Sequence, residues 1–218
     1  MKHADLEHVD HVDLDVQVIE VCKKHFSWGA AWDDPRVSLH ISDGAAFVRR
    51  AADGYYDVIV QDSSDPWTWN DAGEVVPLPS AVLYTEEHFQ QLYRILGKDG
   101  ILNLQSETFN IPADLDGIVV WRRDLLKVGF ERSRYGSILI SSYPTGHIGF
   151  LMCEKNVDSA STPEYVKSRF STMEANNRGT TYYHPKLQDS AFDLPLWAER
   201  TIYANVDDAT VASTNEEL

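Results

Sequence analysis

Two carboxylates, Asp62 and Asp65, follow a short β-branched run in the middle of the chain. The run at residues 58–60 indicates a strand that is buried on both faces, and a polar loop at residues 62–66 comes directly after it. Pro66 disfavours helical geometry in the residue before it, so the loop does not turn straight into a helix. Ligands of open α/β sheets bind just beyond the carboxyl ends of strands, where these carboxylates are expected. In an alternative interpretation, both side chains only accept hydrogen bonds from loop amides in an Asx-type turn.

Two further predicted strands end in acidic side chains. Asp13 ends a strand predicted over residues 9–14, and Asp43 with Gly44 follows a strand predicted over residues 37–41. A carboxylate at such a position can accept hydrogen bonds from ribose hydroxyls or from an adenine amino group, and glycine lets the backbone pass close to a ligand. Asp43 also fits the N-cap of the helix that follows, and the two roles are compatible.

The elements that would position these groups alternate between strand and helix. Helices are predicted over residues 15–26, 45–52, 85–96 and 113–128, strands over 9–14, 37–41, 58–61 and 101–105, and an antiparallel pair over 130–141 and 148–153. Residues 67–82 form a connection that is long for a compact α/β domain, and long structured loops of this kind are often lids. This order predicts an α/β fold with a mostly parallel sheet and an antiparallel end.

The composition is that of an ordinary globular protein, since 43% of the 218 residues are hydrophobic and 24% are charged. A formal net charge of −15 argues against a nucleic-acid partner, because it would repel phosphates, and it suits a cationic ligand. Alternatively, the acidity only keeps the protein soluble. Cys22 and Cys153 indicate core thiols in a reducing compartment, and no segment has the pattern of a signal peptide or a membrane span. A soluble, cytoplasmic protein is expected.

Histidines and carboxylates are interleaved near the start of the chain. His3, His8 and His11 lie among acidic residues over positions 1–15. These residue types would suit a metal site, but their spacing fits alternation along a strand better. We therefore predict no metal site.

Several short motifs accompany the 62–66 loop along the chain. They are VDLD at 12–15, SDG at 42–44, KDGIL at 98–102, QSE at 105–107, SYPTGHIGF at 142–150, YYHP at 182–185 and AFDLP at 191–195. In this order they resemble the spermidine synthase family, the aminopropyltransferases. The resemblance runs from about residue 12 to residue 195, and it implies a methyltransferase-like Rossmann fold.

The resemblance also implies a reaction. An aminopropyl group would pass from decarboxylated S-adenosylmethionine to a diamine such as putrescine, giving spermidine and methylthioadenosine. By resemblance Asp62 is the catalytic base, and Asp65, Gln105 and Tyr143 bind the acceptor. A base is needed because an alkyl ammonium, with a pKa of about 10, must lose a proton before its nitrogen can attack carbon. Alternatively, Tyr143 only stiffens the turn at residues 143–146.

The donor side is implied in the same way. By resemblance Asp13 binds the ribose of the donor and Asp43 binds its adenine, with Gly44 beside it. No cofactor is implied beyond decarboxylated S-adenosylmethionine, which is a co-substrate.

The chain departs from the family pattern in two places. The family has an N-terminal β domain and a glycine-rich donor loop before the matching part, and neither is found in this sequence, so the first central strand is expected to be missing. Trp67 and Trp69 stand where the family's gatekeeping loop usually has small residues, which leaves the identity of the acceptor open. We interpret residues 1–205 as an N-terminally truncated catalytic domain and residues 206–218 as an acidic tail, and we expect a homo-oligomer.

Two other functions stay open at the level of sequence. An S-adenosylmethionine-dependent methyltransferase would share the fold and the ribose-binding acid, although the Asp62 and Asp65 pair with Tyr143 suits a diamine better. The other alternative is an inactive truncated homologue that acts as an oligomer subunit.

Overall fold

The computed structural model describes residues 5–159, 163–175 and 180–204. Its strands are β1 (Val9–Asp13), β2 (Val37–Ile41), β3 (Tyr56–Gln61), β4 (Trp67–Trp69), β5 (Val75–Pro77), β6 (Leu96–Gln105), β7 (Arg132–Leu139) and β8 (His147–Glu154). Its α-helices are α1 (Val16–His25), α2 (Gly44–Arg50), α3 (Glu86–Ile95), α4 (Pro112–Val128), α5 (Pro163–Ala175), α6 (Pro185–Ala191) and α7 (Leu196–Ile202). Short 3₁₀ segments cover Ser27–Asp33, Pro79–Tyr84 and Val157–Ser159. Among the described residues, no helix is both long and apolar enough to cross a membrane.

The helices begin and end where the local chemistry requires. The side chain of Asp15 accepts a hydrogen bond from the amide of Gln17 at the start of α1, and Thr85 caps α3 in the same way through the amide of His88. At the far end of α4, Gly129 has a φ of 126° that a residue with a Cβ rarely adopts. The predicted helices over 15–26, 45–52, 85–96 and 113–128 are thus confirmed to within a few residues.

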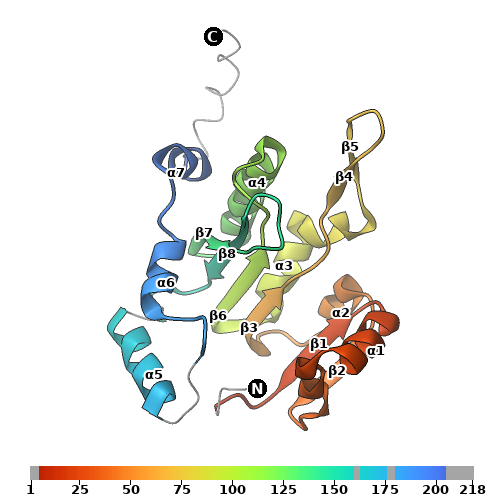
Figure 1. Ribbon diagram of the computed structural model, residues 1–218, viewed down its shortest axis with the longest axis vertical. Coiled ribbons are helices and arrows are strands. Elements are labelled where there is room, and N and C mark those ends of the chain that lie inside the picture. Colours follow the sequence, from red (N-terminus) through yellow and green to blue (C-terminus); the bar gives the residue numbers. More distant parts are fainter. Residues whose placement is uncertain (1–4, 160–162, 176–179, 205–218) are drawn as a thin grey trace.

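The strands form a two-stranded parallel sheet, β1–β2, and a four-stranded sheet of order β3-β6-β8-β7. In the larger sheet β3 and β6 are parallel, whereas β8 is antiparallel to both β6 and β7. The predicted α/β fold with an antiparallel end is confirmed. Figure 1 shows β1 and β2 with α1 and α2 as one group beside β3.

No described strand pairs with the facing edges of β1 and β3. This arrangement agrees with the predicted absence of a first central strand. A single side-chain hydrogen bond between the two strands is described, in which the Tyr56 hydroxyl of β3 donates to Asp10 Oδ2 of β1 over 2.8 Å.

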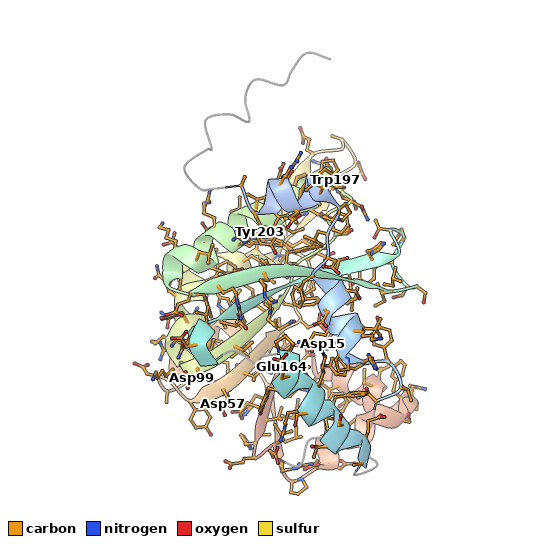
Figure 2. The ribbon with its side chains drawn as sticks, turned by 90° about the vertical axis from the view of Figure 1, so that its left-hand side faces the viewer. Asp15, Asp57, Asp99, Glu164, Trp197 and Tyr203 are labelled. Atoms are coloured by element: carbon orange, nitrogen blue, oxygen red, sulfur yellow. The ribbon has the colours of Figure 1, made fainter. Side chains whose placement is uncertain are left out.

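One face of the larger sheet packs against α3 and α4. The aliphatic and aromatic side chains that are no more than 2% exposed include Phe89, Leu92, Leu102, Leu104, Ile118, Leu125, Leu151 and Ile202. Each side chain of this size stabilises the fold by roughly 1.5–3 kcal/mol when it leaves water. Figure 2 shows Asp57 and Asp99, near the beginnings of β3 and β6, well away from Trp197 of α7 and from Tyr203, which follows that helix. Because β3 and β6 are parallel, their carboxyl ends lie at one edge of the sheet, away from Asp57 and Asp99.

The prediction that the run at residues 58–60 is buried on both faces is wrong. Val58 is 57% exposed and Val60 is 67% exposed, whereas Ile59, which points to the opposite face, packs against the core. The reason is that side chains alternate across a strand, and only the face of β3 that carries Ile59 packs against the core.

Three other differences concern segments that local patterns describe poorly. The connection at residues 67–82 contains a small antiparallel hairpin, β4–β5, in which Trp67 pairs with Pro77. Strand β6 begins five residues earlier than predicted, at Leu96 instead of 101. Helix α5 was not foreseen, and none of its residues is buried. The predicted acidic tail at residues 206–218 lies outside the described residues.

Candidate active site

The loops that follow β3 and β6 begin at the same edge of the larger sheet. Gln61, the last residue of β3, is paired with Leu104 of β6 in parallel register. Asp62 and Asp65 are exposed in the loop after β3, and Gln105 ends β6. The two predicted carboxylates and the predicted amide therefore share the carboxyl edge of the sheet, where ligands of α/β proteins bind.

A chain of hydrogen bonds joins these two loops. Ser63 Oγ donates to the Tyr84 hydroxyl over 3.2 Å, and that hydroxyl donates to Gln105 Oε1 over 3.0 Å. Gln105 Nε2 donates in turn to Glu107 Oε1, 3.1 Å away. Burial raises the pKa of Tyr84 to about 12, and the nearby Glu107 carboxyl adds to the effect, so the hydroxyl keeps its proton. Because Ser63 follows Asp62 directly, this network fixes the loop that carries the predicted base.

A buried amide and imidazole hold the chain on the other side of Asp62. Gln61 Oε1 lies 3.0 Å from His88 Nε2, and Gln61 Nε2 donates to the Leu83 carbonyl over 3.0 Å. Burial lowers the pKa of His88 to about 4, and the positive charge of Arg49 adds to the effect. The imidazole is therefore neutral near pH 7, and its Nε2 proton is donated to Gln61.

A cavity of about 260 Å³ lies beside this edge of the sheet. Its lining includes Asp65, Trp67, Glu107, Asp114 and Tyr143, which come from the loop after β3, the β4 strand, the loop after β6, helix α4 and the β7–β8 turn. We call it the acidic cavity. Carboxylates gathered in one concave site create a negative potential that suits a cation.

Two carboxyls of the acidic cavity hold their protons more tightly than usual. Burial raises the pKa of Glu107 to about 7, and the neighbouring Asp65 carboxylate adds to the effect, although the bond from Gln105 opposes it. Burial also raises the pKa of Asp114, again with a contribution from Asp65. Glu107 is 8% exposed and, among the described residues, it is the one non-glycine with a positive φ, 48°. Backbone strain of this kind is often found at functional sites.

Tyr143 reaches the same edge of the sheet from the turn between β7 and β8. It is 43% exposed. Partial burial raises the pKa of its hydroxyl, and Asp65, Glu107 and Asp62 contribute in that order. These influences place Tyr143 near the two carboxylates for which the sequence predicted a shared ligand.

The predicted nucleoside-binding acids lie at the carboxyl ends of the smaller sheet. Asp13 Oδ1 accepts a hydrogen bond from the Asp15 amide over 2.8 Å. Asp43 Oδ1 accepts one from the Ala46 amide over 2.6 Å, so Asp43 is the N-cap of α2. The capping role of Asp43 is confirmed, and the nucleoside-binding roles of both acids stay predictions.

Gly44 is not required by the packing of the protein. A Cβ built on Gly44 would come no closer than 3.9 Å to its nearest neighbour, Leu83 Cδ2. Its predicted role, to let the backbone approach a ligand, depends on that ligand.

The structure thus brings Asp62, Asp65, Gln105 and Tyr143 together at the edge of the larger sheet. The other three predicted residues, Asp13, Asp43 and Gly44, form a second group on the smaller sheet. Across residues 5–159, 163–175 and 180–204, no three histidine, cysteine or acidic side chains gather as a metal site would require.

Sequence reasoning missed Glu107 and Asp114. Glu107 stands two residues after Gln105 in the QSE motif, so that motif could have drawn attention to it. Asp114 offers no such signal, because an acid in the first turn of a helix is ordinarily explained by the helix dipole. Its position in the cavity follows only from the tertiary fold.

Comparison with known proteins places this chain in a family. The family model described as "Spermine/spermidine synthase domain" matches residues 1–163. "Spermidine synthase 2" of Arabidopsis thaliana is 30% identical over 206 residues, which cover 92% of this chain and 56% of that protein. "Spermine synthase" of Arabidopsis thaliana is 31% identical over 207 residues, which cover 92% of this chain and 53% of that protein. The chain thus spans a little over half the length of these relatives.

Solved structures agree with this placement. Spermidine synthase from Thermotoga maritima superposes with a TM-score of 0.73 at 26% identity, over 92% of this chain and 62% of that one. Human methyltransferase-like protein 13 superposes with a TM-score of 0.52 at 20% identity, over 84% of this chain and 78% of that one. The second likeness concerns the fold alone.

Proposed function

Since the chain belongs to the spermine/spermidine synthase domain family, we propose that its site serves the transfer of an aminopropyl group from decarboxylated S-adenosylmethionine to a diamine. The single observation that carries this proposal is the pair of carboxylates in the loop after β3, where Asp62 directly follows the strand and Asp65 lines the acidic cavity. Electrostatics of this sign suit both a diammonium acceptor and a cationic sulfonium donor.

The reaction is a displacement at carbon. The nitrogen lone pair of the acceptor attacks the propyl carbon next to the sulfonium, the carbon–sulfur bond breaks, and its electron pair stays on sulfur as the neutral thioether of methylthioadenosine. The acceptor must first lose a proton, because an alkyl ammonium has a pKa of about 10. Asp62 takes that proton, and Asp65 holds the amine in line with the bond that breaks.

The other site residues position the two substrates. Tyr143 contacts the acceptor from the wall of the acidic cavity, and Gln105 contacts it from the end of β6. On the smaller sheet, Asp13 accepts hydrogen bonds from the ribose hydroxyls of the donor and Asp43 accepts one from its adenine. No step needs a metal or a cofactor. The proposal extends to a cytoplasmic protein that works as a homo-oligomer.

The test is a turnover assay with decarboxylated S-adenosylmethionine and putrescine, together with calorimetric titration of methylthioadenosine. Formation of spermidine and methylthioadenosine in equal amounts is the expected result. A protein that neither turns over nor binds the nucleoside would contradict the proposal.

A second candidate function is binding without catalysis. The observation that favours it is that, among the described residues, no strand pairs with the facing edges of β1 and β3, which lie between the nucleoside side of the site and the acceptor side. Nucleoside binding without product in the assay above would favour this candidate.

The methyltransferase alternative has the fold in its favour, but three carboxylates around the acceptor cavity suit an ammonium better than a methyl acceptor without charge.

A further inference from the structure

Trp67 occupies a slot on one face of α4, next to the acidic cavity. Its ring stacks on that of Trp121, with 5.2 Å between the ring centroids and 21° between the planes. Burial raises the pKa of the Asp114 carboxyl, and the neighbouring Trp67 indole lowers it in part. Because Asp114, Gly117 and Trp121 are spaced i, i+3 and i+7, they lie along a single face of the helix. We call these three residues the α4 slot.

Gly117 is what lets the ring lie so close to the helix. A Cβ on Gly117 would come within 2.4 Å of Trp67 Cη2, a distance that real Cβ atoms do not reach. Glycine in a helix interior costs about 1 kcal/mol relative to alanine. The close approach of the Trp67 ring gives that glycine a packing reason.

The seated ring forms part of the wall of the acidic cavity. Trp67 and Asp114 both line the cavity, whereas Gly117 and Trp121 lie behind the ring and do not. The ring therefore stands between the cavity and the space over Gly117. Removing the ring would join that space to the cavity and lengthen it.

We propose that Trp67 sets the depth of the acidic cavity, so that the site takes a short diamine and excludes amines that are one aminopropyl arm longer. This inference rests on the proposed function, because it assumes that the cavity holds the acceptor. A short diamine places one amino group near Asp65 and the other beside Asp114, before it meets the ring. A longer amine would have to displace an indole that is stacked on Trp121 and seated against Gly117 of the helix.

The experiment measures amine binding by calorimetry, so it does not depend on turnover. Putrescine and spermidine are titrated into the parent protein and into Trp67→Ala, Trp67→Phe and Gly117→Ala. In the parent we expect putrescine to bind at least about tenfold more tightly than spermidine, the scale on which a filled pocket rejects a longer ligand. Trp67→Ala should reduce this preference to about twofold or reverse it, and Trp67→Phe, which keeps a ring, should restore much of it.

Gly117→Ala approaches the same contact from the helix. The new methyl group should drive the ring toward the cavity and weaken the binding of both amines. Without the ring, the methyl group has nothing to displace. The double variant that combines Trp67→Ala with Gly117→Ala should therefore bind both amines as Trp67→Ala alone does. Val75→Ala, on the partner strand of the hairpin and outside the cavity lining, is the matched control and should leave the preference unchanged.

The outcomes separate this inference from the proposed function. A parent that binds the amines while Trp67→Ala keeps the same preference overturns the role of Trp67 and leaves the proposed function standing. A parent protein that binds neither amine contradicts the proposed acceptor, and the inference that Trp67 sets the depth of the cavity is then wrong as well. Thermal unfolding of each variant, recorded in the same buffer, excludes loss of fold as the cause of lost binding.

Discussion

At the scale of single residues, Asp62 is held from both sides. The preceding Gln61 is hydrogen-bonded to His88, and the following Ser63 is hydrogen-bonded to Tyr84. We expect Asp62→Asn to lower turnover at least about a hundredfold, the usual scale for a general base, because the amide cannot accept the proton of the acceptor. The measurement is the steady-state rate with putrescine, accompanied by the affinity for methylthioadenosine, which should change little.

Asp71→Asn is the matched control for this variant. It makes the same chemical change at an exposed carboxylate near the tip of the β4–β5 hairpin and should keep the parental rate. Turnover of Asp62→Asn within a few-fold of the parent would remove Asp62 from the role of base.

Glu107 should make the stability of the protein depend on pH. Burial raises its pKa from an ordinary value of 4.5 to about 7. Between these pH values the folded protein keeps a proton that the unfolded chain has lost, so this carboxyl makes folding less favourable as the pH rises from 4.5 through 7. Glu107→Gln has no charge to bury. The melting temperature of this variant minus that of the parent should therefore increase from pH 5 to pH 8.

Glu87→Gln, an exposed acid in the first turn of α3, is the control for this effect. The difference in melting temperature between this control and the parent should be the same at pH 5 and at pH 8. If the difference in melting temperature between Glu107→Gln and the parent is also constant from pH 5 to pH 8, the assignment of a raised pKa to Glu107 is wrong.

These residues also show what a sequence can predict at this scale. The sequence predicts Asp62 and Gln105 as site residues because Asp62 directly follows a strand and Gln105 ends one, and a strand end is visible in a local pattern. It predicts Asp65 from its place in the same loop as Asp62. Glu107 and Asp114 acquire their raised pKa values from burial by segments distant in sequence. No local pattern reports such burial.

At the scale of elements, Asp43 has one role that is observed and one that is predicted. It caps α2, and it is the predicted ligand of the adenine amino group. Asp43→Ser separates the two roles, because serine is as good an N-cap as aspartate but carries no carboxylate. We expect methylthioadenosine to bind about threefold to tenfold more weakly, the value of one lost hydrogen bond, while the melting temperature stays close to that of the parent.

Asp15→Ser makes the same change at the N-cap of α1, and it should leave both quantities unchanged. An affinity of Asp43→Ser equal to that of the parent would leave Asp43 with the capping role alone.

Elements were predictable where a strong periodic pattern met a recognisable cap or glycine, as in α3 and α4. The β4–β5 hairpin was missed because its two strands have three residues each and lie in a stretch rich in Trp, Pro and Gly. The burial of β3 was overestimated because an apolar β-branched run predicts a strand, whereas the number of its faces that are covered depends on which helices pack there. For Val58 and Val60 no described element packs on their face.

At the scale of the whole molecule, the separation of the two sheets has a consequence for association. The facing edges of β1 and β3 carry backbone amides and carbonyls without a strand partner among the described residues. Beside one of these edges, Val58 and Val60 expose an apolar, β-branched surface. Unpaired edges of this kind are templates for pairing with another chain.

We therefore expect purified residues 1–218 to associate at micromolar concentration, and Val60→Lys to shift the protein toward the monomer. A charged side chain on an edge strand opposes pairing because its burial would cost several kcal/mol. Size-exclusion chromatography with light scattering gives the mass of each species, and circular dichroism checks that the fold is kept. Val120→Lys, a partly exposed position on α4 away from both edges, is the control and should not change the mass. A parent protein that is monomeric and unfolds cooperatively would show that these edges are satisfied within one chain, and the association that we expect from the open edge of β3 would then be wrong.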